Sequence, residues 1–227
     1  MNSIIMSTEK YELSASLMEM GFDIIPSEYI GCMLPFEARH ADMQCLRIND
    51  TVFVLNECEH LIGDLKSRNV HTVKTKGCIG GRYPNNVLLN AVYFHNRLYC
   101  KESALDCTVK DYCIQNDIEI INVNQGYTKC STAIINDKFV TSDRGIFQAM
   151  RKSGEEGALI SPGHIRLDGV DYGFIGGACF EDEKNVFFTG DIKKHPDYDI
   201  IKSICGNKNI ICMSDDIMYD IGGFVSL

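Results

Sequence analysis

The feature that most constrains this chain is a short repeated pattern of strand, two-residue turn, strand and polar helix cap. The clearest copy is residues 134–143, in which Asn136 and Asp137 form the turn. Three further copies follow the same order: residues 48–57, 94–102 and 181–191. Repetition of this kind indicates structural units that pack against their neighbours. The helix cap therefore serves as a ruler along the chain.

The caps recur at similar intervals and each precedes the same elements. Ser7, Glu57, Glu102, Asp143 and Asp191 are separated by 50, 45, 41 and 48 residues. Each cap precedes a helical pattern, with apolar residues at three- and four-residue steps, and then a β-rich segment. The predicted helices span residues 8–20, 58–68, 103–116, 144–153 and 192–205, and the β-rich segments span 22–25, 70–73, 118–121, 158–160 and 210–212.

The two ends of the chain complete each other. Residues 3–6 match a second strand without a first strand before it, and residues 221–227 match a first strand with nothing after it. Pairing of these segments would close the units into a ring and cover the strand edges. We therefore predict an α/β fold of one domain, residues 1–227, with five ββαβ units in a closed propeller. The predicted units are residues 30–76, 77–124, 125–169, 170–217, and 218–227 together with 1–29.

Charge and composition argue against several classes of protein. The formal net charge is −9, with 31 acidic and 22 basic residues, which disfavours nucleic-acid and anionic-membrane partners. No apolar run approaches the ~20 residues of a membrane-spanning helix, and residues 1–30 lack the pattern of a secretory signal. The 11 cysteines include no Cys-x-x-Cys pair, so a structural zinc site is disfavoured. We expect a cytoplasmic protein with reduced thiols, no metal and no cofactor.

Five ββαβ units in a ring resemble the pentein, or guanidino-group-modifying, superfamily. That superfamily includes arginine deiminase, dimethylarginine dimethylaminohydrolase, agmatine deiminase and amidinotransferases, and also a non-catalytic ribosome-binding initiation factor. The resemblance covers the whole chain as repeat architecture. It implies that first strands line a central channel and that functional groups lie near the starts of these strands. The matching segments are residues 39–44, 83–90, 126–132, 175–178 and 220–223.

His40 and Asp42 form a His-x-Asp motif similar to that of the deiminases. The resemblance implies that the histidine is a general acid/base and that the carboxylate orients the substrate or the imidazole. A histidine with a pKa near its usual value of about 6.5 suits proton transfer at neutral pH. Asp42 lies two residues further along a predicted strand, so the two side chains would share one face. The alternative is a buried histidine beside a salt-bridged aspartate.

Cys130 matches the nucleophile of the superfamily, because it lies 90 residues after His40, close to two repeats. The resemblance implies that its thiolate attacks an amidine carbon and forms a covalent thiouronium, which water or an amine resolves. Lys129 or the histidine would lower the thiol pKa. The alternative is a buried, inert cysteine, and ten other cysteines make it a strong one.

Gly176-Gly177-Ala178 matches a Gly-Gly-Asp motif of the superfamily, except that Ala178 replaces the acid. A planar cation is best held by a carboxylate, so Asp42, Asp220 or Glu37 would have to take over this role. Without a replacement, the substrate is not a guanidine or there is no reaction. Predicted substrate contacts are Arg39, Arg82, Asn86, Asp220 and Gly177, with the arginines suited to a substrate carboxylate.

The sequence is compatible with two functions. The first is a cysteine-dependent hydrolase or amidinotransferase that acts on the guanidine- or amidine-type C–N bond of a small molecule. It requires Cys130 and His40 to face each other across a central cavity. The second is a non-catalytic binding protein, similar to the ribosome-associated initiation factor. An open acidic cavity around the thiol favours the enzyme, whereas a channel filled by side chains favours the binding protein.

Overall fold

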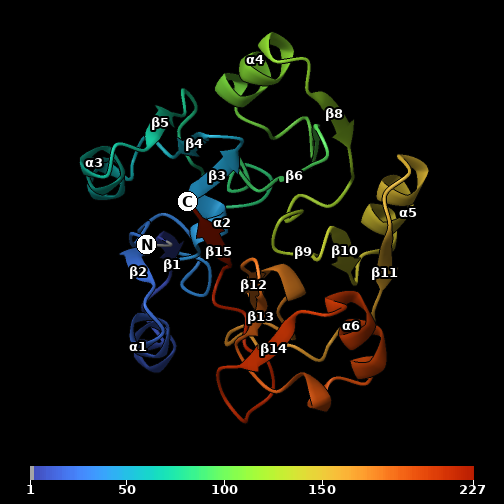
Figure 1. Ribbon diagram of the computed structural model, residues 1–227. Helices are drawn as coiled ribbons and strands as arrows, with labels where there is room; N and C mark the ends of the chain where they lie inside the picture. The colour runs from blue at the N-terminus through green and yellow to red at the C-terminus, as the bar shows by residue number, and fades with distance from the viewer. Residues whose placement is uncertain (1–2) are drawn as a thin grey trace.

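The computed structural model describes residues 3–227 and places them in five mixed sheets of three strands each. The sheets surround a common centre and the longer helices lie on the outside (Figure 1). In every sheet the first two strands are antiparallel, and the third is parallel to the second. The predicted α/β propeller of five ββαβ units is therefore confirmed.

Four sheets are continuous in sequence. They consist of β3 (Cys45–Ile48), β4 (Thr51–Val54) and β5 (His71–Lys74); β6 (Val92–Phe94), β7 (Arg97–Cys100) and β8 (Glu119–Asn122); β9 (Thr132–Ile135), β10 (Lys138–Thr141) and β11 (Gly157–Leu159); and β12 (Cys179–Glu181), β13 (Asn185–Phe188) and β14 (Asn209–Cys212). The fifth combines both ends of the chain: β15 (Phe224–Ser226), β1 (Ser3–Met6) and β2 (Asp23–Pro26). Ile5 of β1 lies opposite Val225 of β15, which confirms closure by the terminal strands.

Each unit has one longer helix between its second and third strands, as a parallel connection requires. These helices are α1 (Tyr11–Glu19), α3 (Glu59–Ser67), α4 (Cys107–Gln115), α5 (Arg144–Lys152) and α6 (Tyr198–Cys205). The single helix predicted over residues 192–205 is wrong. A short 3₁₀ turn, η2 (Ile192–Lys194), precedes α6, and the two are separated because Pro196 disfavours helical backbone at His195.

The hairpin turns agree with the repeated sequence pattern. His95 and Asn96 have φ values of 47° and 60°, and Asn136 and Asp137 have values of 51° and 58°. Two positive φ values are typical of the type I′ turn, whose twist matches that of the flanking strands. Local turn chemistry thus sets the register of these hairpins.

The first strands begin later than predicted, which corrects the geometry expected for His40 and Asp42. His40 is extended, whereas Asp42 belongs to the helical turn α2 (Ala41–Gln44) before β3. The Asp42 amide donates to the Gly222 carbonyl, 2.9 Å away, so it is bonded to the fifth unit and not to a strand of its own sheet. Residues 175–177 likewise form a 3₁₀ turn, η1 (Ile175–Gly177), before β12.

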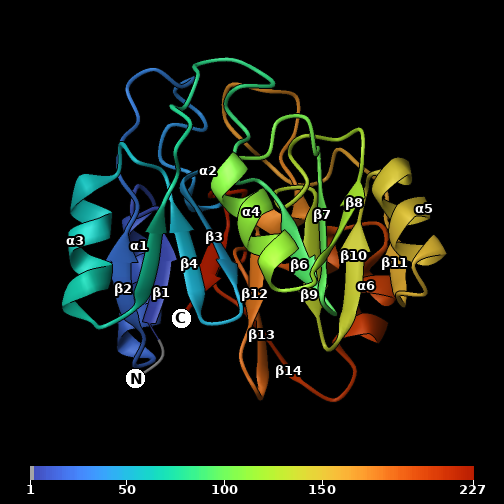
Figure 2. The same ribbon diagram turned by 90° about the horizontal axis from the view of Figure 1, so that it is seen from above.

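The ring has two unlike faces. The loops that precede the first strands gather on one face, which we call the loop face, and the hairpin turns and the C-terminus lie on the opposite, hairpin face (Figure 2). Within residues 3–227, no helix has both the length and the apolar character needed to cross a membrane.

An ion-pair network joins the sheet of β6–β8 to the sheet of β9–β11. The Glu155 side chain, only 4% exposed, accepts from His95 Nδ1 at 2.7 Å and from Arg97 Nη1 at 2.8 Å. The other ring nitrogen of His95 lies 2.8 Å from Asp137 Oδ1. The hydrogen bond with Glu155, followed by that with Asp137, raises the pKa of His95. The protonated imidazole therefore stabilises the contact between the two units.

We expect His95→Asn to lower the free energy of unfolding most at mildly acidic pH. Because the folded-state pKa is raised, this stabilisation is complete below the unfolded pKa of about 6.5 and is lost as pH rises through the folded value. Urea unfolding between roughly pH 5.5 and 8.5 measures the difference between wild type and variant. His60→Asn, at an exposed position on α3, is the control. A difference that stays constant across this range would contradict the prediction.

Candidate active site

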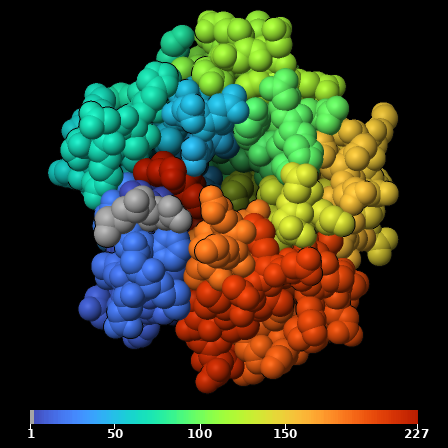
Figure 3. Space-filling model, viewed as in Figure 1, coloured from blue at the N-terminus to red at the C-terminus, as the bar shows by residue number. Residues whose placement is uncertain are grey.

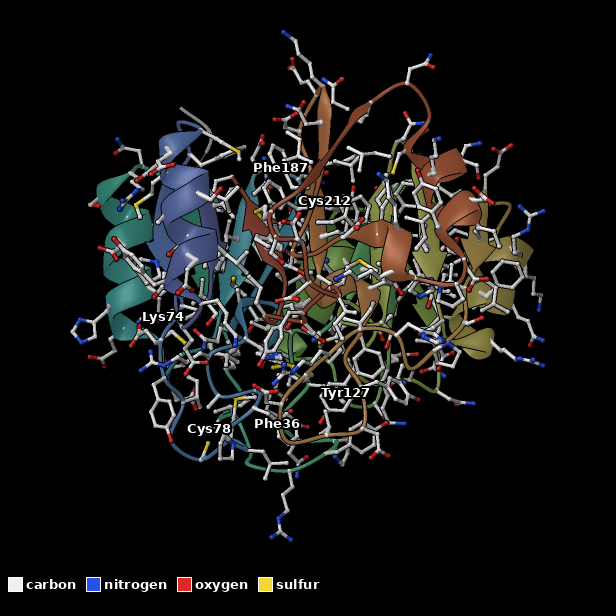
Figure 4. All side chains as sticks on the ribbon, turned by 90° about the horizontal axis from the view of Figure 1, so that it is seen from below. Phe36, Lys74, Cys78, Tyr127, Phe187 and Cys212 are labelled. Atoms are coloured by element: carbon white, nitrogen blue, oxygen red, sulfur yellow. The ribbon has the colours of Figure 1, made fainter. Side chains whose placement is uncertain are left out.

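A cavity of about 300 Å³ opens on the loop face. Its position is marked in Figure 4 by Phe36 and Tyr127, which lie on the side of the molecule opposite Phe187 and Cys212. The volume lies at the lower end of the range for small-molecule sites, roughly 300–1,000 Å³. Residues from several units line it: Phe36, Glu37, His40, Met43, Tyr127, Cys130, Leu167, Val170, Asp171, Tyr172, Phe174 and Asp220. Cys130 and His40 therefore share one cavity.

Aromatic rings form a wall on one side of this cavity. Tyr127 stacks on Phe174 with ring centroids 6.5 Å apart, and Tyr83 stacks on Tyr127 at 5.8 Å. Tyr172 packs edge-on against Phe174 at 6.1 Å and is itself 39% exposed. The faces of aromatic rings carry partial negative charge and attract cations. The wall therefore favours a flat or cationic ligand.

Two buried carboxylates, Glu37 and Asp220, line the cavity. Glu37 accepts one hydrogen bond on each oxygen, from Asn86 Nδ2 at 2.8 Å and from the Tyr127 hydroxyl at 3.2 Å. Asp220 accepts from the backbone amides of Phe174 and Gly222, each at 2.8 Å. A carboxylate oxygen has two lone pairs, so each retains capacity for another donor. Among the described residues that line the cavity there is no lysine or arginine.

Asn90 holds the Cys130 thiol in place. Its Oδ1 accepts from the amides of Lys129 at 2.7 Å and Cys130 at 3.3 Å, and its Nδ2 donates to Cys130 Sγ at 3.0 Å. Asn90 is 1% exposed and also donates to the Asp42 carbonyl at 3.1 Å. Asn90 was not among the predicted site residues, although it lies in the segment 83–90. The sequence feature that could have indicated Asn90 is its position as a second asparagine, four residues after Asn86, at the end of that segment.

Burial controls the protonation of the thiol and of the carboxyl group behind it. Burial, then the charges of Asp42 and Asp220, raise the pKa of the Cys130 thiol well above its usual range, and the hydrogen bond from Asn90 opposes this. Burial raises the pKa of Asp42 to about 7, which the charge of His40 opposes. Neither Asp42 oxygen has a hydrogen-bond partner among residues 3–227. The thiol is therefore protonated at neutral pH, and Asp42 titrates there.

The other predicted site residues divide into two groups. Gly177 and Asn86 support the cavity: a side chain at Gly177 would overlap the Asp220 carboxylate, and Asn86 binds Glu37. Arg39 and Arg82 do not line it. Arg39 pairs with Glu9 at 3.3 Å and lies over the Tyr29 ring, and Arg82 is exposed. The predicted contact between these arginines and a substrate carboxylate has no support from the cavity.

The alanine that replaces the superfamily acid does not face the cavity. Ala178 is fully buried in the apolar core formed with Ile175 and Phe188. Of the three acids considered as replacements, Glu37 and Asp220 line the cavity, whereas Asp42 lies fully buried beside Gly223. Within residues 3–227, no group of three or more His, Cys, Asp and Glu side chains is arranged to hold a metal ion.

We expect Asn90→Leu to lower the free energy of unfolding by about 2–4 kcal/mol, because it leaves the buried amides of Lys129 and Cys130 without an acceptor. The substitution also removes the donor to Sγ, so alkylation of Cys130 should require a higher pH. Chemical unfolding measures the first effect, and peptide mass spectrometry after iodoacetamide treatment at several pH values measures the second. Asn86→Leu is the matched control, since it removes a buried amide that does not touch the thiol. Equal alkylation profiles for the two variants would rule out this role of Asn90.

Comparison with known proteins places the chain in a fold and a family. The P. aeruginosa dimethylarginine dimethylaminohydrolase in complex with citrulline aligns with a TM-score of 0.59 at 10% identity, over 99% of this chain and 98% of that one. A second dimethylarginine dimethylaminohydrolase, an adduct with S-methyl-L-thiocitrulline, gives 0.56 at 10% identity over 94% and 92%. The C. jejuni agmatine deiminase gives 0.52 at 11% identity over 94% and 86%.

These alignments confirm the pentein fold. A search of curated protein sequences finds no match. A family model matches residues 4–225, and the chain belongs to that family, described as a family of unknown function (DUF6873).

Proposed function

We propose that this protein is a cysteine-dependent enzyme that cleaves a C–N bond in a small guanidinium or amidinium compound, as a hydrolase or an amidinotransferase. The observation that carries the proposal is a single cavity that combines the Cys130 thiol, His40, and the carboxylates of Glu37 and Asp220. The names of the structural neighbours, dimethylarginine dimethylaminohydrolase and agmatine deiminase, support the same class.

Glu37 and Asp220 are the groups that bind the cation. Both are almost fully buried, at 2% and 1% exposure, and their existing hydrogen bonds fix the carboxylates before a ligand arrives. A guanidinium is planar and offers several N–H donors, so it can bind two carboxylates at once. The aromatic wall supplies a surface for the face of the same group. Glu37 and Asp220 together take the role of the superfamily acid, whose position is occupied by Ala178 in this chain.

Binding of the cation also activates the thiol. The charges of Asp42 and Asp220 contribute to the raised pKa of Cys130, and a positive charge placed beside Sγ offsets them. Deprotonation is thereby coupled to substrate binding, and His40, which lines the same cavity as Cys130, accepts the proton. In the absence of substrate the thiol stays protonated and unreactive, because the thiolate is the nucleophile.

The reaction then proceeds in two halves. The Cys130 thiolate forms a bond to the amidine carbon, and the C–N bond to the leaving group breaks as His40 gives that nitrogen a proton. This leaves a thiouronium on Cys130. A water molecule, or an amine in the transferase case, loses a proton to His40 and adds to the same carbon. The C–S bond breaks, and His40 returns the proton it took from the water or amine to the sulfur, which restores the thiol.

A second candidate is a non-catalytic protein that binds the same cationic ligands. The raised thiol pKa and the alanine at position 178 favour it. It differs from the enzyme only in turnover, since both use Glu37 and Asp220 to hold the ligand. A catalytic assay combined with a binding assay separates the two.

For catalysis, we expect wild type to release ammonia or an alkylamine from at least one member of a panel of guanidino compounds, with and without carboxylates. Cys130→Ser should lower kcat by roughly 10³-fold or more, because the hydroxyl is a far weaker nucleophile. Cys113→Ser, at a buried cysteine in α4 that does not line the cavity, should leave kcat within about twofold. Unchanged turnover by Cys130→Ser would exclude Cys130 as the nucleophile. Binding without turnover would identify the non-catalytic function.

For binding, we expect Glu37→Gln to weaken the affinity for agmatine by about tenfold or more, since one charge-assisted contact contributes about 1.5–3 kcal/mol. Calorimetric titration in a Cys130→Ser background measures affinity without turnover. Glu156→Gln is the control, because the Glu156 side chain is 71% exposed and pairs with Lys138 on the surface. Equal affinity in Glu37→Gln and its parent would remove Glu37 from the site.

A further inference from the structure

A second cavity, of about 430 Å³, opens at the centre of the hairpin face. Figure 3 shows this face, with a hollow between the coloured units at the middle of the ring. The first strands of all five sheets contribute to its wall: β3, β6, β9, β12 and β15. None of its lining residues is shared with the loop-face cavity. It is therefore a separate site at the other end of the ring.

Lys129 contributes to this cavity a positive charge that is not part of any ion pair within residues 3–227. The residue is half-buried and lines the hairpin-face cavity, whereas its neighbour Cys130 lines the cavity on the loop face. Its ammonium contacts the Gly176 carbonyl at 3.5 Å, the upper limit for a hydrogen bond. It forms no ion pair with any side chain of residues 3–227. An ammonium has three donors, so most of its capacity is unused.

The other charged residues of the cavity already have partners. Glu181 binds Lys208 at 2.8 Å and accepts from the Asn136 amide at 2.7 Å. Arg47 lies 4.0 Å from Asp50 Oδ1 and donates to the carbonyls of Asn49 and Ser226, each at 2.9 Å. An anionic ligand would therefore pair with Lys129. Such pairing is favourable because burial of an unpaired charge is unfavourable.

The rest of the wall is largely apolar. Its apolar members come from each of the five first strands or the residue just before one: Leu46, Ala91, Val92, Ala133, Ile134, Phe180, Phe224 and Val225. Such walls offer no hydrogen bonds to a highly charged ligand, but burial of apolar ligand surface against them is favourable. One ammonium among apolar walls matches one negative charge on an apolar body.

We propose that the hairpin-face cavity binds a small organic monocarboxylate, with the carboxylate on the Lys129 ammonium and the apolar body between the five first strands. A single carboxylate would pair with Lys129, the cation of this cavity that forms no ion pair within residues 3–227. Inorganic phosphate, which carries a second negative charge for part of its population at neutral pH, would leave that charge without a partner. It also lacks the apolar body that the wall would bury.

The test uses butyrate and benzoate as probes, with affinity measured by calorimetric titration of the whole chain. Wild type should bind at least one of them with a dissociation constant of about 1 mM or lower. Lys129→Met should weaken this affinity by about tenfold or more, while Lys129→Arg, which keeps the charge, should stay within roughly threefold. Lys138→Met is the matched control, since Lys138 pairs with Glu156 on the surface, and it should bind like wild type. Inorganic phosphate should bind more weakly than butyrate.

A second measurement locates the ligand without any variant. Titration of ¹⁵N-labelled wild type with butyrate should shift the amide resonances of Ala133, Phe180 and Val225 on the cavity wall. Absence of saturable binding up to roughly 50 mM would overturn the proposal, as would unchanged affinity in Lys129→Met. Shifts confined to residues of the loop-face cavity would overturn it as well. Because neither measurement depends on turnover, failure here is distinct from failure of the proposed catalytic function.

Discussion

The antiparallel pairing of β1 with β15 is the interaction on which the rest of the ring depends. It joins the two ends of the chain, so the segment that precedes β15 is carried to the centre of the ring. That segment holds Asp220, and the Gly222 carbonyl accepts the Asp42 amide at 2.9 Å. Gly222 has a φ of 81° and lies so close to His40 that any side chain there would overlap the imidazole. Closure of the ring and assembly of the loop-face cavity are therefore one event.

The loop-face cavity holds two carboxylates, Glu37 and Asp220, that are not part of any ion pair within residues 3–227. Glu37 and Asp220 are stabilised by hydrogen bonds from neutral groups, and Asp42 has no hydrogen-bond partner among residues 3–227. Burial of carboxylates without cations is costly, and such departures from simple stability are expected at functional sites. A cationic ligand in the cavity would relieve this cost for Glu37 and Asp220. The unfavourable burial of these carboxylates therefore increases the affinity of the cavity for cations and its selectivity against neutral and anionic ligands.

Much of the fold follows from local sequence, because the turns and caps repeat and each hairpin is specified by its own turn residues, such as Asn136 and Asp137. The repeat phase also carries His40, Cys130 and Asp220 to the ring centre. Two features depend on contacts between units and could not be predicted. The helical turn at Asp42 is bonded to Gly222, and Asn90 binds backbone amides 39 and 40 residues further along the chain. Arg39 lies next to His40 in sequence, yet its side chain pairs with Glu9 outside the cavity.

Lys129 and Cys130 are adjacent in sequence and line opposite ends of the ring, so the layer between the two cavities is thin. The charge of Lys129 acts through that layer to oppose the burial that raises the pKa of Asp42, and Asp42 in turn raises the pKa of the Cys130 thiol. An anion bound to Lys129 would cancel part of this opposition and make the loop-face cavity more negative. It would strengthen the attraction for a cation there, and the cation would strengthen the binding of the anion by the same factor. With both ligands bound, the two ends of the ring would thus be coupled through charge.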